Sequence, residues 1–509
     1  MLVGDVAHPP ADRPASDAAP APHLMDDVAR PLAELLDPER TTARLADVGH
    51  SAETAAAFAS LIALAARALR DDGVPADRPV HAFVAPGRIE VLGKHTDYAG
   101  GRSLLAAIER GICVVAAART DDRVIVIDAM DRDRAEFVLS PDLEPRAGSW
   151  ANYPMTVARR IARNFPEATT GADIAFASNL VRASGMSSSA ALVTAVFLAL
   201  AAVNRLGATE RYRAAIRSPE ELAEYISAVE NGGGHPGLPG DRGVGTDGGS
   251  EDHTAILCCR PGHLAQASFR PVRLERSVAL PGGLTFIVAF CSVHAEKTGA
   301  AMARYNRAAE LTRIATEIWR AGTGRHDPHL AAALESGTGG ALEPAPGPGP
   351  ESGPNAVSGA APDALDRLRA LLERATHPRA TAAELIARVE QFAEESRLLI
   401  PAAADALSRG DVAAFGDLVD RSQHLAETRL GNQIEETIIL ARAARELGAA
   451  AASAFGAGFG GSVWALVEGG AAPEFIERWR ARYLERFPEH AEGFVAFATR
   501  PAPAAVRVG

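Results

Sequence analysis

The amino-acid sequence predicts a protein of the α/β (α+β) class. Three features carry this expectation: β-rich runs, Ala- and Leu-rich runs with helical spacing, and glycine-rich segments that separate them. With 509 residues the chain is long enough for two or three domains, each with its own core. A hydrophobic content of 47% and a charged content of 23% are ordinary for a globular protein.

The first part of the chain changes character near residue 82. Residues 1–24 are rich in Ala, Pro and Asp and are expected to form a disordered tail, followed by a helical lead-in over 25–80. Short strands are expected from 82 onward. The run "ICVVAAARTDDRVIVIDA" (112–129) has two β-rich stretches around a Thr-Asp-Asp turn, which predicts a β-hairpin.

Two helices are predicted in the middle of the chain. Residues 187–205 form an apolar helix opened by serines, and residues 218–231 carry helix-start chemistry. In the second helix Ser218 can cap, Pro219 suits the first turn, and Glu221 completes a capping box. Its apolar residues fall on one stripe, made of Leu222, Tyr225, Ile226 and Val229.

Two segments are too rich in glycine to be regular elements. Residues 232–249, "GGGHPGLPGDRGVGTDGG", are expected to be a loop, and residues 337–362 to be a flexible insertion. Long amphipathic helices are predicted after 363. Near the end, "FGAGFGGSVWALVEGG" (455–470) runs from a glycine loop into a strand.

Charge and composition exclude some classes of partner. A net charge of −12 and a pI near 5.7 argue against a general nucleic-acid binder or a binder of anionic membranes. No signal-peptide pattern is visible, and the most apolar run (190–203) is too short to span a bilayer, so a buried helix is expected there. The four cysteines lack metal-ligand spacing, which favours a reduced, cytoplasmic setting.

A run of serines before the first of the two central helices is a candidate phosphate-binding loop. In "VRASGMSSSAALVTA" (181–195), Gly185 and three serines precede the helix, where free N–H groups and the helix dipole attract phosphate. Ser187, Ser188 and Ser189 could add hydrogen bonds or a Mg²⁺ ligand. A simple serine cap on a buried helix explains the same residues, and no Walker A motif follows.

Two further motifs are weak when taken alone. The glycines of "GAGFGG" (456–461) let backbone approach a ligand closely, but they also suit a tight turn. Asp252, in "GGSEDHTAIL" (248–257), lies after a glycine turn and before an apolar run. A phosphoryl-transfer enzyme needs such a carboxylate to accept a hydroxyl proton, although a lone Asp in a turn is usually a cap.

Taken in order, these motifs resemble the galactokinase branch of the GHMP kinases. The resemblance rests on "PGRIEVLGKHTDYAGG", "SGMSSSAAL", "ENGG…GGSEDH" and "FGAGFGGSVWALV", spans about 82–468, and includes "RYNRAAE" at 304–310. It implies a two-domain GHMP kinase fold with mixed sheets and packed helices, and an ATP and substrate site between the domains. The N-terminal domain would cover 81–278, and the C-terminal domain 279–500 with the Gly/Pro-rich insertion at about 337–362.

The resemblance also implies roles for particular residues. Asp252 would be the proton acceptor and Arg88 the residue that offsets charge at the reacting centre. Ser189 and Glu230 would hold Mg²⁺. The sugar would be bound by Lys94, His95, Thr96, Asp97, Tyr98, Gly249 and Tyr305, with His95 and Asp97 bonding its hydroxyls. The phosphates of ATP would be wrapped by Ala183, Ser184, Gly185, Met186, Ser187, Ser188 and Ser189, above a floor shaped by Gly458, Gly460 and Gly461.

The sequence departs from the family pattern in several places. It has GKHTDY for the usual GEHTDY, Glu90 for an Asn, and Glu251-Asp252-His253 for Met-Asp-Gln. The segment between Glu230 and Asp252 is about ten residues longer than usual, with the glycine-rich loop supplying the excess. The phosphate loop reads ASGMSSS rather than GAGLSSS.

Lys94 is the departure that bears most on the substrate. Lysine occurs only at 94 and 297, so 50 of the 52 basic residues are Arg. Since a Lys can only donate hydrogen bonds, Lys94 favours an acceptor or anion and raises the hypothesis of an acidic sugar such as a uronic acid. The alternative is that Lys94 pairs with Glu90 or Glu251 and restores local neutrality.

The resemblance therefore predicts an ATP-dependent kinase that phosphorylates the anomeric hydroxyl of galactose or a related sugar. Three alternatives remain: a kinase for an acidic sugar, a related kinase for a non-sugar alcohol, and a catalytically silent sensor of ATP and sugar. The HTDY stretch disfavours the non-sugar alcohol, and the presence of Arg88, the serine run and Asp252 disfavours the silent sensor. The expected partner is a small-molecule sugar, with no nucleic acid or membrane, and the chain is expected to be a monomer or homodimer.

Overall fold

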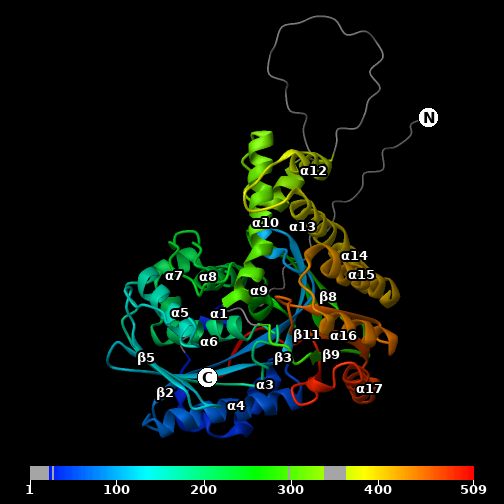
Figure 1. Ribbon diagram of the computed structural model, residues 1–509. Coiled ribbons are helices and arrows are strands. Elements are labelled where there is room, and N and C mark those ends of the chain that lie inside the picture. The colour runs from blue at the N-terminus through cyan, green and yellow to red at the C-terminus, as the bar shows by residue number, and fades with distance from the viewer. Residues whose placement is uncertain (1–21, 26–27, 296–298, 337–362) are drawn as a thin grey trace, which may run out of the picture.

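The computed structural model describes residues 22–25, 28–295, 299–336 and 363–509. The expected insertion at 337–362, and all but the last three residues of the expected tail at 1–24, lie outside the described residues. Two sheets organise the rest of the chain (Figure 1). The chain is therefore of mixed α/β class, as the sequence predicts.

The larger sheet has nine strands. Its main path runs in the spatial order β1 (Arg30–Pro31), β2 (Pro79–Leu92), β3 (Arg102–Ala118), β6 (Ala172–Ser178), β4 (Arg123–Asp128) and β5 (Arg134–Val138). β13 (Val506–Arg507) pairs with β2, β7 (His263–Ser268) with β3, and β8 (Arg273–Ala279) with β7. The pairs are antiparallel except β4 with β6, which is parallel, so the sheet is mixed.

The hairpin expected over 112–129 is wrong. The two β-rich runs do form strands, β3 and β4, but β6 lies between them and pairs with both. The Thr-Asp-Asp turn therefore connects strands that are not neighbours. A local turn signal could not reveal that a strand some 50 residues later inserts between them.

Helices cover both faces of this sheet because its strands alternate apolar residues between two cores. On β2, Phe83 and Ala85 face one core, and Val80, Ala82 and Val84 face the other. The second core is covered by α2 (Leu32–Leu35), α3 (Pro38–Asp47) and α4 (Ala52–Asp71), at the bottom of Figure 1. On the other face lie α1 (Pro22–Met25), α5 (Asn152–Asn164), α6 (Ser188–Val203), α7 (Glu210–Ala215), α8 (Pro219–Asn231) and α9 (Glu251–Cys258).

The smaller sheet is antiparallel and has the order β10 (Ala451–Phe455), β11 (Ser462–Glu468), β9 (Leu284–Phe290) and β12 (Val495–Thr499). One face packs on α16 (Glu435–Glu446) and α17 (Ala472–Leu484). The other face, through Phe286 and Trp464, shares a core with the larger sheet and with α14 (Ile400–Ser408) and α15 (Val412–Leu425). The two sheets are therefore joined by buried apolar contact.

A third cluster of helices stands above the sheets in Figure 1. It is formed by α10 (Gly299–Thr323), α11 (Leu330–Ser336), α12 (Ala364–Arg374) and α13 (Ala382–Glu394), which bury a separate apolar core around Trp319 and Phe392. α13 continues through the π-helical turn η3 (Glu395–Leu399) into α14, and α15 continues through a second one, η4 (Ala426–Leu430). Ala99, in the turn η1 (Asp97–Ala99) between β2 and β3 of the larger sheet, packs in the core of this cluster.

Both central helices form as predicted. α6 is buried along its length apart from its first serines, and α8 buries its predicted stripe, Leu222, Tyr225, Ile226 and Val229. Ser218 caps α8 by accepting a bond from Glu221 N at 3.2 Å. The capping box is not completed, because the Glu221 carboxylate instead accepts a bond from the backbone N–H of Arg217.

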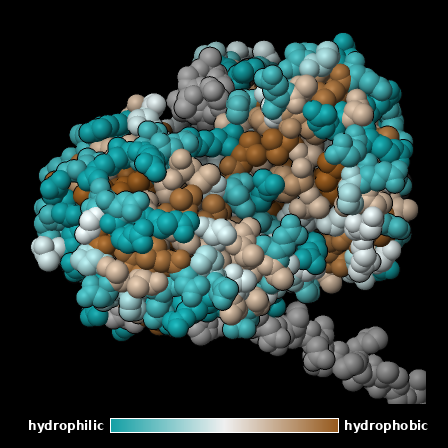
Figure 2. All heavy atoms as spheres, turned by 90° about the horizontal axis from the view of Figure 1, so that it is seen from below, coloured by the Kyte–Doolittle hydropathy of each residue, from teal (hydrophilic) through white to brown (hydrophobic). Residues whose placement is uncertain are grey.

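The four cysteines, the most apolar long helix and the surface complete the description of the fold. All four cysteines are buried and form no disulfide. Within the described ranges, α4 alone is long and apolar enough to cross a membrane by length and composition, and half of that stretch is buried against the sheet. On the face shown in Figure 2, hydrophilic residues cover much of the surface, with hydrophobic residues gathered in patches between them.

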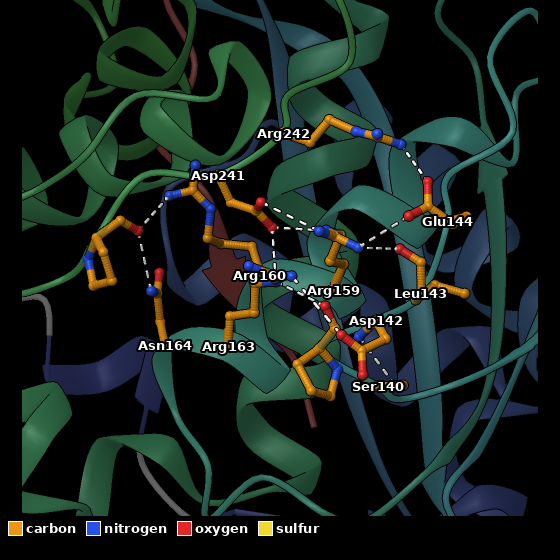
Figure 3. Close-up of polar contacts among 12 residues, drawn as sticks. Ser140, Asp142, Leu143, Glu144, Arg159, Arg160, Arg163, Asn164, Asp241 and Arg242 are labelled. Atoms are coloured by element: carbon orange, nitrogen blue, oxygen red, sulfur yellow. Dashed lines mark hydrogen bonds and ion pairs between the residues drawn. The ribbon is translucent and has the colours of Figure 1, made fainter.

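The glycine-rich segment 232–249 forms no helix or long strand and is fixed to α5 by arginines (Figure 3). Arg159 binds Asp241 at 2.7 Å, and Arg163 reaches the same carboxylate at 3.1 Å. Arg160 is 1% exposed and donates to the carbonyl groups of Ala228, Gly233 and Pro239 at 2.8–3.1 Å. One buried guanidinium thus satisfies the carbonyl groups of Gly233 and Pro239 in this loop and of Ala228 near the end of α8.

Replacing Arg160 with Met should lower the free energy of unfolding by about 3 kcal/mol, because several buried carbonyl groups lose their donor. Urea denaturation followed by circular dichroism would measure the change. Arg163→Met is the matched control, since this side chain is 38% exposed and its loss should cost less than about 1 kcal/mol. Equal effects of the two substitutions would contradict the role assigned to Arg160.

Candidate active site

The first cavity, which we call the sugar-side cavity, lies where the end of β2, the turn η1 (Asp97–Ala99) and the start of α9 meet. It is lined by Arg88, His95, Asp97, Tyr98 and Asp252. Gly249 and Tyr305 line the same cavity from the glycine-rich segment and from α10. The structure therefore brings together most residues that were predicted to be catalytic or sugar-binding.

Arg88 and Asp252 form the strongest polar contact in this cavity. Arg88 Nε donates to Asp252 Oδ1 at 2.8 Å, and Nη2 lies 2.6 Å from the same oxygen. Burial lowers the pKa of Arg88, but the charges of Asp252 and of its neighbours Glu251 and Glu90 outweigh burial and raise it. Asp252 is the second residue of α9 rather than part of a turn, so the helix directs its side chain to the guanidinium.

The "HTDY" residues form a bonded set around the cavity. His95 Nε2 donates to the carbonyl oxygen of Ala457 at 3.1 Å, because a carbonyl can only accept, and Nδ1 lies 3.1 Å from the Tyr98 hydroxyl. Asp97 accepts bonds from the backbone N–H groups of Tyr98 at 2.8 Å and Glu251 at 3.1 Å. Burial raises the pKa of Asp97. These bonds fix the turn η1 against the start of α9.

Lys94 and Thr96 do not reach the cavity, which corrects the expectation that they touch the substrate. Lys94 is 1% exposed, and its ammonium donates to the hydroxyls of Ser453 at 2.8 Å and Ser422 at 3.3 Å. The Thr96 hydroxyl bonds to the backbone carbonyls of Gly93 and Arg102. The contact that motivated an acidic substrate is therefore absent.

The second cavity, which we call the nucleotide-side cavity, has a volume of about 570 Å³. Ala183, Gly185, Ser187, Ser188 and Ser189 line it at the start of α6. The volume is in the usual range for a small-molecule or cofactor site. Among these residues, Ser187 has a buried hydroxyl oxygen without a hydrogen-bond partner in the described chain, which leaves a polar group for a ligand.

Two members of the serine loop support it from behind rather than line the cavity. The Ser184 hydroxyl donates to the carbonyl of Val181 at 2.7 Å, and the Met186 side chain is buried in the core. The carbonyls of Gly185 and Met186 accept bonds from Arg88, the first from its side chain and the second from its backbone. Arg88 thus holds the serine loop as well as Asp252.

Aromatic residues also line the nucleotide-side cavity, and no sequence motif marks them. Trp150, Tyr153 and Phe176 line it together with Leu180, and the rings of Trp150 and Phe176 lie 5.8 Å apart. Such a wall suits a flat heteroaromatic ring. Trp150 and Tyr153 lie at the start of α5, and Phe176 and Leu180 lie on or just after β6, so only the fold brings the two groups together.

In "GAGFGG", Gly456 lines the sugar-side cavity, whereas Gly458, Gly460 and Gly461 line neither cavity and pack against neighbouring backbone. A Cβ at Gly461 would lie 3.0 Å from the carbonyl oxygen of Ser184, and one at Gly458 would lie 2.3 Å from the carbonyl oxygen of Asn432. Gly460 packs in the same way on Val293. Their predicted role as a floor beneath the phosphates stays a prediction, and the residue of this loop that lines both cavities is Ala457.

The two cavities adjoin, because Arg88 and Ala457 line both of them. A group bound by the serine loop and a hydroxyl bound near Asp252 would therefore meet at the Arg88 guanidinium. A cation at this point offsets negative charge that develops on a transferring phosphoryl group. The arrangement can support transfer of a phosphoryl group from a ligand in the nucleotide-side cavity to a hydroxyl group in the sugar-side cavity.

The predicted metal ligands lie on two helices that pack together. Ser189 lies in the first turn of α6 in the nucleotide-side cavity, and Glu230 lies in the last turn of α8 in the sugar-side cavity. Glu230 Oε2 is 3.2 Å from His253 Nε2, so the carboxylate already has one neighbour. Within the described part of the chain, no three or more His, Cys, Asp or Glu side chains are grouped so that they could hold a metal ion by themselves. The two residues therefore line different cavities, and their assignment to Mg²⁺, which binds oxygen ligands and takes few of them from protein, stays a prediction.

Comparison with known families agrees with this geometry. The family model described as the galactokinase galactose-binding signature matches residues 74–118, the GHMP kinases N-terminal domain matches 152–241, and the GHMP kinases C-terminal model matches 403–485. The first contains Arg88 and the HTDY turn, and the second contains the serine loop.

Several proteins with similar sequences are galactokinases. A galactokinase of Roseiflexus sp. is 29% identical over 394 residues, which cover 76% of this chain and 84% of the relative. A galactokinase of Chloroflexus aggregans is 27% identical over 413 residues, which cover 80% of this chain and 89% of the relative. A galactokinase of Actinobacillus pleuropneumoniae is 44% identical over 110 residues, 21% of this chain and 28% of its own. The crystal structure of Lactococcus lactis galactokinase complexed with galactose shares the fold, with a TM-score of 0.64 and 21% identity over 84% of this chain and 94% of that one.

Fold, site and relatives together define a kinase of the GHMP class, with a nucleotide side and an acceptor side that meet at one arginine. Within that class, the family-model matches and the relatives support a galactokinase-like GHMP kinase. It is an ATP-dependent phosphotransferase whose acceptor is a sugar hydroxyl.

Substitution of Gly249 by Ala should damage the sugar-side cavity alone. The added Cβ would lie 2.4 Å from Asp97 Oδ2 and 2.7 Å from Tyr98 N, so the HTDY turn must shift. We expect the KM for sugar to rise by about tenfold or more, as loss of one hydrogen bond to a charged group implies, with the KM for ATP unchanged. Steady-state kinetics with each substrate varied in turn would measure this.

Gly237→Ala is the control for this substitution. Gly237 belongs to the same glycine-rich segment and has a positive φ of 77°, but nothing lies within 4 Å of an added Cβ. It should cost about 1 kcal/mol of stability and leave both KM values as they are. A rise in the KM for ATP in Gly249→Ala would show that the damage is not local.

Proposed function

We propose that the chain transfers the γ-phosphoryl group of ATP to the anomeric hydroxyl of galactose or a closely related sugar, with Asp252 as the base. The observation that carries this proposal is the position of the Arg88–Asp252 pair at the junction of the two cavities. Base and charge-stabilising cation are placed where an acceptor hydroxyl and a phosphoryl group would meet.

Asp252 accepts the proton of the attacking hydroxyl. Its carboxylate is bonded to Arg88, and a carboxylate held by a guanidinium is ionised but only weakly basic. Transfer of the proton to so weak a base becomes favourable as the new P–O bond forms and the hydroxyl oxygen loses charge. The pair therefore suits a reaction in which positioning and charge stabilisation contribute more than proton abstraction.

The serine loop and Arg88 act on the phosphoryl group. The Ser187 hydroxyl and the backbone N–H groups at the start of α6 bind phosphate oxygens, and Arg88 offsets the charge that builds up during transfer. Mg²⁺ would be held by Ser189 and Glu230 together with phosphate oxygens, and when bound it neutralises phosphate charge.

The sugar is held by His95, Asp97 and Tyr305. The Asp97 carboxylate accepts hydrogen bonds from sugar hydroxyls, and the bond from His95 to the Ala457 carbonyl fixes the orientation of the imidazole ring. The ring of Tyr305 lies 5.3 Å from that of His95 and lines the cavity. Galactose is the preferred candidate because the galactose-binding signature matches this segment and because the similar solved structure holds galactose. The acidic-sugar hypothesis loses its support, since Lys94 does not line the cavity.

Asp252→Asn should lower kcat with galactose and ATP by about 10²- to 10⁴-fold, because the amide cannot accept the proton. Binding of sugar and of nucleotide, measured by calorimetry, should persist within a few fold. Coupled detection of ADP would give kcat. Asp247→Asn is the matched control: this side chain is 40% exposed, pairs with Arg313 and does not line either cavity, so turnover should stay unchanged.

Unchanged turnover in Asp252→Asn would refute the base assignment. Binding of both ligands by the unaltered chain without any ADP formation would instead support the silent sensor. Thermal unfolding of the variant separates these outcomes from misfolding, since loss of Asp252 leaves the buried Arg88 with one fewer counter-charge.

A further inference from the structure

Two more carboxyl groups lie in the sugar-side cavity at positions where the family pattern has neutral residues. Glu90 is on β2, two residues after Arg88, and Glu251 opens α9 just before Asp252. Both line the cavity, and they are 3% and 5% exposed. Burying a carboxyl group is costly unless hydrogen bonds or counter-charges satisfy it.

The protein satisfies these carboxyl groups only in part. Glu251 Oε2 accepts a bond from the Ser103 hydroxyl at 2.6 Å, and Oε1 lies 3.9 Å from Arg88 Nε. Glu90 Oε2 accepts a bond from Gly456 N at 3.3 Å. Glu90 Oε1 is buried and receives no hydrogen bond from an amide or hydroxyl group of the described residues. One acceptor atom in the wall of the cavity is therefore left for a ligand.

The two carboxyl groups interact with each other, and we call them the Glu90–Glu251 pair. Their side chains are within hydrogen-bonding reach. Burial raises the pKa of both groups, and the charge of Glu90 raises the pKa of Glu251 further. At Glu90 the charges of Lys94 and Arg88 and the hydrogen bond with Glu251 lower the pKa but do not outweigh burial. A pair that keeps one proton has one carboxyl group that donates and one that accepts, which matches a hydroxyl group, itself a donor and an acceptor.

We propose that the Glu90–Glu251 pair binds a hydroxyl group of the acceptor sugar and makes the cavity select neutral sugars against anionic ones. The inference rests on the proposed function, because it assigns a further contact within the same cavity. Lys94 cannot make this contact, since its ammonium is committed to Ser453 and Ser422.

The charge of the cavity supports the same selection. Its walls carry the carboxyl groups of Glu90, Asp97, Glu230, Glu251 and Asp252, against the single guanidinium of Arg88. A carboxylate on the sugar would be repelled at close range, where burial keeps the effective dielectric constant low. A neutral hydroxyl gains a charge-assisted hydrogen bond without this repulsion.

Glu90→Gln tests the contact. The amide keeps the shape of the side chain but removes the carboxyl group from the pair. In the full-length chain with galactose and ATP, we expect the KM for galactose to rise by about tenfold or more, with kcat changed less than about threefold and the KM for ATP unchanged. Glu251→Gln should give the same pattern, which keeps the test valid if one variant fails to fold.

Glu395→Gln is the matched control, because Glu395 is also a fully buried carboxyl group near Lys94 but does not line the cavity. It accepts bonds from Gly93 N at 2.9 Å and the Ser422 hydroxyl at 2.8 Å. Its loss should lower thermal stability and leave the KM for galactose within about twofold. An equal rise in KM for the control would show that the effect reports buried charge and not contact with the sugar.

A series of galactose analogues, each lacking one hydroxyl group, locates the contact. The unaltered enzyme should bind one of these analogues at least about tenfold more weakly than galactose, and Glu90→Gln should weaken that analogue no further while it weakens the others. Additive losses for every analogue, or an unchanged KM for galactose in both pair variants, would overturn the inference. Turnover of galacturonate as fast as galactose would overturn the selection against anions.

These results are distinct from failure of the proposed function. If the unaltered chain consumes no ATP with galactose, or if Asp252→Asn retains turnover, the proposed function fails before the pair is tested. If galactose is phosphorylated and depends on Asp252, the response of Glu90→Gln bears on the pair alone.

Discussion

The buried guanidinium of Arg88 is the constraint on which the rest of the site depends. It bonds to Asp252 on α9 and to the serine loop through Gly185, and its own backbone N–H bonds to Met186. A charge this deeply buried is stable only if counter-charges and carbonyl oxygens surround it, so the larger sheet must bring α9 and the serine loop to the same point. The requirement that stabilises Arg88 is also the one that joins the two cavities.

The residues around Arg88 that depart from the family pattern, Glu90, Lys94 and Glu251, have charges that act on one another. Glu90 and Glu251 add negative charge beside Arg88, and Lys94 adds a buried positive charge whose effect is to lower the pKa of Glu90. A lysine at position 94 and a glutamate at position 90 therefore compensate one another. The charge of Lys94 is buried behind the cavity wall, while the carboxyl groups of Glu90 and Glu251 line the cavity itself.

How much of this was visible in the sequence depended on how local each signal is. The two central helices and the serine loop followed from motifs whose residues lie close together in the chain. The meeting of Arg88, His95 and Asp97 with Asp252, which is 164 residues from Arg88, was expected only from the resemblance to the kinase family. The β3–β4 hairpin was wrong because β6 pairs between those strands. The direction of the Lys94 side chain depends on Ser422 and Ser453, more than 300 residues away, and no local pattern records it.

The shape of the serine loop depends on contacts with residues far away in the chain. The carbonyl oxygen of Ser184 accepts a bond from the Ser462 hydroxyl, 278 residues later, and a Cβ at Gly456 would lie 2.8 Å from the carbonyl oxygen of Gly185. Close approach of two backbones requires glycine on at least one side, and here both loops supply it. The serine run alone cannot hold the shape of the proposed phosphate-binding loop, because the loop between β10 and β11 forms its support. The glycines of that loop thus act through packing, and the proposed phosphate site depends on both sheets rather than on one motif.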